Sequence, residues 1–177
     1  MPRVGLDPAA VVAAAAGLAD EVGLTNVTMG LVAERLGVRA PSLYKHVSNQ
    51  ADLNRRIADL ALTEVGDALR DGLQGRSGRD ALAAAAHATR AYVLEHPGRY
   101  ATLVRIDDDR ALGFLTAALA GYHLDPADTV HALRLFRSLL HGFAVLEAAG
   151  GFQLDTDLDE SFAWLVDFLD RGLRSAV

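Results

Sequence analysis

Apolar residues recur three and four positions apart along nearly the whole chain, and no segment shows the sustained alternation of a β-strand. The first such run covers residues 8–22. Asp7 and Pro8 precede it in the order expected for an N-cap and a first helical residue, and Gly23 provides a C-terminal stop. The pattern predicts an all-α protein.

A second, short helix is predicted to begin after Thr28, whose hydroxyl group suits an N-cap. We expect this helix to run through Leu36, with an inner face made of Leu31, Val32 and Leu36. Gly37 follows as the residue that ends it.

A third helix is predicted from Pro41 to about Val47, with Leu43 and Val47 four residues apart on its inner face. Two short helices joined by a tight glycine turn form a helix-turn-helix motif. In such a motif the second helix is positioned to enter the major groove of DNA.

The rest of the chain also predicts helices, separated by turn residues. Ser48 and Asn49 precede a long helix, and the Gly/Ser-rich stretch 72–78 breaks the pattern. Asp125-Pro126 repeats the opening device of Asp7-Pro8. We therefore expect two domains, a three-helix domain over residues 1–48 and a helical domain over residues 49–177.

The charge distribution favours a nucleic-acid surface only in the first third of the chain. Residues 1–60 hold six basic and six acidic side chains, whereas the remainder holds 11 basic and 17 acidic ones. Lys45 is the only lysine. The predicted basic cluster of the first 60 residues consists of Arg35, Arg39, Lys45, Arg55 and Arg56.

Residues 27–53, VTMGLVAERLGVRAPSLYKHVSNQADL, resemble the N-terminal domain of TetR-family transcriptional regulators. The resemblance implies phosphate contacts for Thr28, Tyr44 and His46, and positions at or near the bases for Arg39, Ala40, Pro41, Ser42 and Lys45. Gln50 stands where the family usually has a lysine that anchors a phosphate. Because one charge is missing, we expect a salt dependence shallower by roughly one unit of slope.

The C-terminal part resembles one subclass of this family at residues 140–150, LHGFAVLEAAG, with Leu140 in place of the subclass tryptophan. The family resemblance implies a domain that binds a small molecule and dimerises. The residues that we expect to line its pocket are Tyr92, Leu103, Phe114, Phe136, Leu140 and His141. A structural role for His141, as a satisfied buried histidine, is the simpler alternative.

The last two predicted helices carry more apolar residues than one buried face needs. This excess favours pairing with a second copy across a twofold axis, and a buried helical hairpin within one chain is the alternative. The expected dimer interface contains Leu139, Phe143, Leu146, Trp164 and Phe168.

Other chemistry finds little support in the sequence. The chain has no cysteine, which excludes disulfides and thiolate sites. Asp155, Asp157 and Asp159 begin like a calcium loop, but Glu160 and Val166 occupy positions where such a loop needs Gly and Glu. We expect no metal, cofactor or catalytic residues, no membrane-spanning stretch, and a cytoplasmic location.

These observations together predict a homodimeric, ligand-responsive transcriptional regulator, a repressor that binds a palindromic operator in double-stranded DNA and is released by a small-molecule effector. Two alternatives predict no DNA binding. One is an all-helical small-molecule-binding protein or enzyme, and the other is a helical adaptor that binds a protein through residues 129–170.

Overall fold

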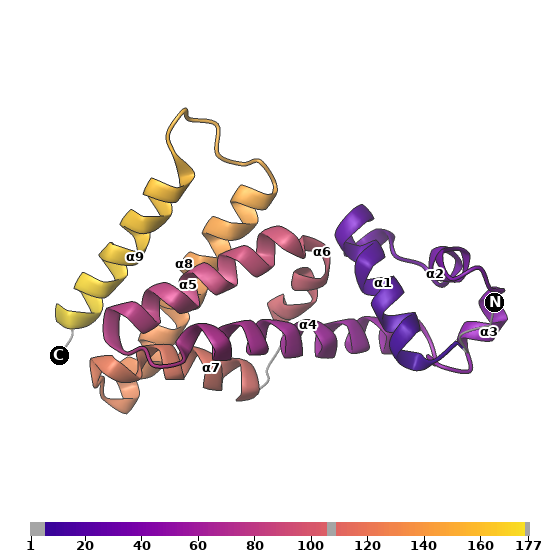
Figure 1. The fold of residues 1–177 in the computed structure, drawn as a ribbon, viewed down its shortest axis with the longest axis horizontal. Coiled ribbons are helices and arrows are strands. Elements are labelled where there is room, and N and C mark those ends of the chain that lie inside the picture. Colours follow the sequence, from indigo (N-terminus) through magenta and orange to yellow (C-terminus); the bar gives the residue numbers. More distant parts are fainter. Residues whose placement is uncertain (1–5, 106–108, 176–177) are drawn as a thin grey trace. The chain divides into compact units, whose positions relative to one another are not determined.

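The computed structural model describes residues 6–105 and 109–175, and every element within these ranges is a helix (Figure 1). The predicted all-α class is therefore confirmed. The elements are α1 (Pro8–Val22), η1 (Leu24–Asn26), α2 (Met29–Arg35), α3 (Ala40–Leu43), α4 (Gln50–Leu73), α5 (Gly78–Glu95), α6 (Pro97–Tyr100), η2 (Ala101–Arg105), α7 (Asp109–Leu119), η3 (Ala120–Tyr122), α8 (Pro126–Ala148) and α9 (Leu158–Ser175).

The chain forms two compact units. Unit 1 comprises Met1–Thr63 and Glu95–Ile106, and unit 2 comprises Glu64–Leu94 and Asp107–Val177. Helix α4 therefore begins in unit 1 and ends in unit 2, while α6 and η2 belong to unit 1 although they follow α5 in the sequence. The expected division at residue 48 concerns function and stays a prediction.

The core of unit 1 is built from small and branched apolar side chains. Helix α1 is the main contributor because its alanines allow close helix packing. The fully buried members include Val11 and Ala15 of α1, Val32 of α2, Leu43 of α3, and Leu53 and Ile57 of α4.

Helix α6 is held against the C-terminal end of α1. Gly98 is buried, and a Cβ atom at this position would overlap the backbone of Ala19. Beside it, the backbone N–H and the Nε–H of Arg99 donate to the two carboxylate oxygens of Asp20, each at 2.8 Å. The close approach of the two backbones therefore requires glycine at position 98.

In unit 2, Arg90 of α5 joins the facing ends of α8 and α9. Its Nε and Nη2 donate to the carboxylate of Glu147 at 2.6 Å, and Nη1 donates to Asp159 at 2.7 Å. The guanidinium carbon lies 4.8 Å from the ring centroid of Phe162 and 5.6 Å from that of Phe143. The hydrogen bonds that Arg90 donates to Glu147, with a smaller part from the one donated to Asp159, raise the pKa of Arg90 despite its burial.

Candidate nucleic-acid interface

The turn between α2 and α3 is fixed by local backbone chemistry. Thr28 Oγ1 accepts a hydrogen bond from Leu31 N at 3.2 Å, which confirms the predicted N-cap. Gly37 has φ of 64°, a conformation that favours glycine, and the N–H of Val38 donates to Ala33 O at 2.9 Å. Two predicted features of this region are wrong in detail.

The first difference concerns α2, because Leu31 is 38% exposed and does not belong to the inner face. Met29 and Ala33 are buried there beside Val32, since the cap at Thr28 sets the phase of the helix relative to the core. Leu36 is half-buried at the end of the helix. The predicted inner face is therefore wrong at Leu31, which faces solvent.

The second difference concerns α3, which ends at Leu43 rather than near Val47. Tyr44, Lys45 and His46 form a turn, closed by hydrogen bonds from His46 N and Val47 N to the carbonyl of Leu43 at 2.8 and 3.0 Å. Leu43 and Val47 are both buried, as predicted. The turn is thus anchored at both ends and presents the three polar residues between two core residues.

The residues expected to contact DNA are largely open to solvent. Tyr44 is 54% exposed, and four of the nine residues are half-buried. The exposed residues are Thr28, Arg39, Pro41, Tyr44 and Lys45, and the half-buried ones are Ala40, Ser42, His46 and Gln50. Because the cap uses only a lone pair of the Thr28 oxygen, its O–H remains a possible donor. All nine belong to unit 1.

Ion pairs within the chain divide the predicted basic cluster. Arg35 pairs with Glu21 at 2.5 Å, and that hydrogen bond lowers the pKa of Glu21. Arg55 and Arg56 pair with Asp52 at 2.5 and 3.1 Å. Within residues 6–105 and 109–175, Arg39 and Lys45 form no ion pair. Of the basic cluster, Arg39 before α3 and Lys45 in the turn after it are therefore available to an external anion.

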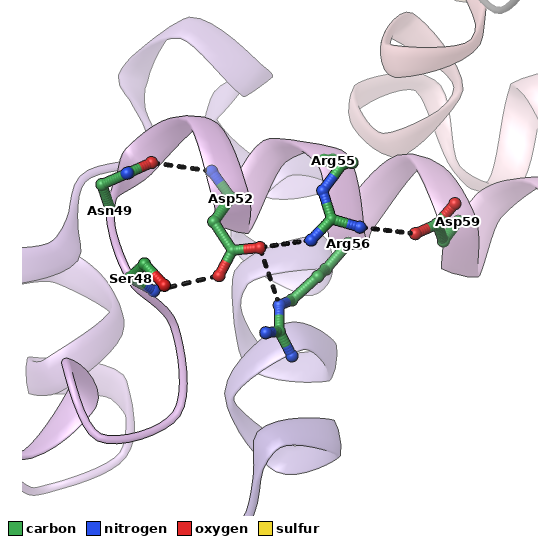
Figure 2. A network of polar contacts seen from close by, with 6 residues as sticks. All are labelled: Ser48, Asn49, Asp52, Arg55, Arg56 and Asp59. Carbon is green, nitrogen blue, oxygen red and sulfur yellow. Dashed lines mark hydrogen bonds and ion pairs between the residues drawn. The ribbon is translucent and has the colours of Figure 1, made fainter.

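Figure 2 shows the polar network at the start of α4, where Ser48 and Asn49 cap the helix. Asn49 Oδ1 accepts from Asp52 N at 2.9 Å, and Asp52 Oδ2 accepts from Ser48 N at 2.9 Å, a reciprocal cap. The hydrogen bond from Ser48, followed by that from Arg56, holds the pKa of Asp52 well below its usual range. The sequence predicted the cap but not the capture of two arginines by its carboxylate.

Gln50, at the first position of α4, is half-buried, and its Nε2 donates to Asn54 Oδ1 at 3.0 Å. That bond uses one of the two amide N–H groups, so the other remains a possible donor to a phosphate oxygen. Gln50 thus occupies the sequence position of the phosphate-anchoring lysine that the resemblance implies, but it lacks the positive charge of lysine.

The residues expected to line an effector pocket do not all lie in one unit. Tyr92, Phe136 and Leu140 are buried in unit 2, and Phe114 and His141 are half-buried there. Tyr92 donates its hydroxyl hydrogen to Glu64 at 2.7 Å. Phe114 lies against Gly66 of α4, where a Cβ atom would overlap its ring. Leu103 lies in η2 of unit 1 instead.

The residues expected at a dimer interface include the most exposed aromatic side chains of α9. Trp164 and Phe168 are 64% and 51% exposed and stack with ring centroids 5.5 Å apart. Leu146 is 50% exposed, while Leu139 is half-buried. Phe143 is also half-buried and contacts the rings of Phe152 and Phe162 in the same chain.

Of the aspartates that begin like a calcium loop, Asp157 caps a helix. Asp157 Oδ1 accepts from Asp159 N at 2.7 Å and from Glu160 N at 3.0 Å at the start of α9. In the part of the chain that the structure describes, no group of three or more His, Cys, Asp or Glu side chains could hold a metal ion. No helix in the same part is long and apolar enough to cross a membrane.

Two family models match the chain. Residues 11–57 match the model described as bacterial regulatory proteins, tetR family, and residues 82–169 match the tetracyclin repressor-like, C-terminal domain. The uncharacterized HTH-type transcriptional regulator YobS of Bacillus subtilis (strain 168) is 34% identical over 182 residues, which cover 97% of this chain and 95% of YobS.

Solved structures with similar folds cover nearly the whole chain. A possible TetR family transcriptional regulator from Streptomyces coelicolor A3(2) gives a TM-score of 0.78 at 22% identity, covering 97% of this chain and 100% of that one. A TetR variant from Acinetobacter baumannii AYE in complex with minocycline gives a TM-score of 0.76 at 25% identity, covering 97% of this chain and 98% of that one.

Proposed function

The chain belongs to the TetR family of transcriptional regulators, and we propose that it is a homodimeric repressor that leaves its operator when a small-molecule effector binds. The observation that carries the proposal is the exposed tract from Arg39 to His46. It is anchored by two buried residues and holds Arg39 and Lys45, the two members of the basic cluster that form no ion pair with any residue the structure describes. We infer that the protein acts in the cytoplasm, where bacterial DNA lies.

On the DNA, the start of α3 and the turn that follows it would enter the major groove. Ala40, Pro41 and Ser42 are small enough for the backbone to approach the base edges, and Arg39 and Lys45 can donate to the N7 and O6 atoms of guanine. The proposed phosphate contacts are Thr28, Tyr44, His46 and Gln50. These contacts would fix the register of the helix without selecting a sequence.

The exposed apolar residues of α8 and α9 support the homodimer. Leu146 of α8 and the stacked pair Trp164 and Phe168 of α9 are large exposed apolar side chains of the kind found at interaction sites. A twofold axis would place two recognition helices on successive turns of the duplex, about 34–36 Å apart, which requires a palindromic operator.

For the effector we propose a pocket in unit 2 lined by Tyr92, Phe114, Phe136, Leu140 and His141. Leu103 is left out because it belongs to unit 1. The minocycline complex of the Acinetobacter protein supports a small-molecule effector and makes minocycline a reasonable first probe. The effector would bind preferentially to the conformation with wrongly spaced recognition helices, and α4, which contributes to both units, would transmit the change.

The proposal is tested by fluorescence anisotropy with the DNA that flanks the protein's own gene, at 50 and 200 mM salt. We expect tight, salt-sensitive binding at one palindromic site. Lys45→Ala should weaken it by about 1–3 kcal/mol, or roughly 5- to 150-fold. Arg76→Ala is the matched control, because it also removes one exposed positive charge but lies in the loop between α4 and α5.

Equal binding by the two variants and the wild type would show that the tract from Arg39 to His46 does not contact DNA. Equal affinity for the native DNA and for a scrambled duplex would show that this DNA contains no specific operator for the protein.

A further inference from the structure

Two arginines near the start of α4 are held within the protein by one carboxylate (Figure 2). Asp52 Oδ1 accepts from Arg55 Nη2 at 2.5 Å and from Arg56 Nε at 3.1 Å. We propose that Asp52 is a specificity-determining residue that keeps both arginines off the phosphate backbone and thereby limits binding to DNA of unrelated sequence. This inference rests on the proposed DNA-binding function.

The position of the Asp52 carboxylate is fixed by contacts at the helix start that do not involve the arginines. It accepts from the backbone N–H of Ser48, and the backbone N–H of Asp52 itself donates to Asn49, so the residue is bound on both sides of the helix start. Its side chain is only 12% exposed. A carboxylate that cannot rotate away keeps its partners in place more firmly than a mobile one.

The other acidic partners of the basic cluster differ in this respect. Glu21, paired with Arg35, is 54% exposed, and Asp59, which accepts from Arg55 at 3.4 Å, is 55% exposed. Exposed ion pairs of this kind contribute little to stability, and salt ions screen them readily. Among these three carboxylates, Asp52 is therefore the effective restraint.

Released arginines at these positions would lie within reach of the duplex. Arg55 is five residues after Gln50, a proposed phosphate contact, which corresponds to about 7.5 Å along the helix axis and roughly 140° around it, so the long side chain has to bend around the helix to reach the backbone of the duplex. Its side chain is 64% exposed, and that of Arg56 is 34% exposed. Each arginine that reaches a phosphate releases counterions and adds about 0.9 to the slope of binding against salt, whatever the base sequence.

The test compares Asp52→Asn with Asp59→Asn, two substitutions that remove the same charge from the same helix. Asparagine keeps one oxygen that can accept from Ser48 N. It carries no negative charge, and its NH₂ group cannot accept a hydrogen bond from the guanidinium groups. The probe is a fluorescent 30-base-pair duplex of scrambled sequence, titrated from 50 to 200 mM salt. We expect Asp52→Asn to bind it about tenfold tighter, with a steeper salt slope, and Asp59→Asn to stay within about twofold of the wild type.

A triple variant identifies the source of the gain. Adding Arg55→Gln and Arg56→Gln to Asp52→Asn should return binding of the scrambled duplex to the wild-type level. Equal binding by Asp52→Asn and Asp59→Asn, or a gain that survives without the arginines, would overturn the inference while specific operator binding by the wild type leaves the proposed function intact. A wild type that binds no DNA at 50 mM salt would overturn both.

Thermal unfolding of each variant accompanies the titrations. If Asp52→Asn does not fold, Arg55→Gln and Arg56→Gln are introduced together into the otherwise native chain. Held arginines make no phosphate contact, so binding of the scrambled duplex should change less than about twofold, and a clear weakening would overturn the inference.

Discussion

Helices α1 and α8 begin with the same dipeptide but expose very different amounts of apolar surface. Asp7 and Asp125 both cap their helices: Asp7 accepts a hydrogen bond from Ala10 N at 2.7 Å, and Asp125 accepts one from Asp128 N at 2.9 Å. Helix α1 buries six residues in unit 1. Helix α8 buries four and leaves four large apolar residues exposed, namely Val130, Leu135, Val145 and Leu146.

The comparison separates two kinds of information. An N-cap works within one turn of helix, so the same residues give the same start in both units. Burial of the remaining apolar residues depends on what the fold brings beside the helix. Helix α1 meets neighbours within its own chain, whereas the exposed residues of α8 are uncovered in the described part of a single chain, which the proposed dimer would explain.

The strongest way to break this comparison is to place a charge on the exposed surface of α8. If a second copy covers this surface, Leu146→Glu would bury an unpaired carboxylate twice in each symmetric dimer. We expect the dimer dissociation constant to rise by at least roughly 100-fold. Sedimentation velocity measures it.

The control for this substitution is Leu154→Glu in the loop between α8 and α9, where the leucine is 86% exposed. We expect that variant to remain dimeric. A wild type that sediments as a monomer at high concentration, or a Leu146→Glu variant that stays dimeric, would contradict the proposed interface.

The next prediction tests the buried side of α1. Gly98→Ala should destabilise unit 1 by roughly 3 kcal/mol, because the new methyl group meets backbone atoms of α1 that cannot rotate away. Gly17→Ala, at a position in α1 where the added Cβ atom would meet nothing within 4 Å beyond its own stretch of helix, should instead stabilise the helix by about 0.5–1 kcal/mol. Denaturant unfolding measures both. Similar effects of the two substitutions would mean that α6 does not pack on α1 as closely as described.

The smallest expected effect concerns the aspartate N-cap that α1 and α8 have in common. Asp7→Ala and Asp125→Ala should each reduce stability by about 1 kcal/mol, since each removes the acceptor for the first free N–H groups of its helix. Circular dichroism during thermal unfolding gives the values. A difference of more than about 1 kcal/mol between them would show that the cap depends on its tertiary surroundings.

Much of the fold could be predicted because its signals are local. The helix starts at Pro8, Met29, Pro126 and Leu158 follow from a cap immediately before each of them. The proposed DNA-binding tract could be located because its residue types and spacing fall within one short stretch. The length of α3 could not be predicted, since Leu43 and Val47 would also lie on one inner face of a continued helix, so their burial is the same with the turn at residues 44–46.

The sequence by itself determined the helical class, most helix boundaries and the exposed polar tract, because each depends on interactions between residues a few positions apart. The tertiary structure decided which charges remain available. Arg90 meets Glu147 across 57 positions, and Arg35 meets Glu21 across 14, so a count of basic residues could not show which of them face solvent unpaired. Long-range pairing depends on how helices pack, and packing is a property of the whole core rather than of any one segment.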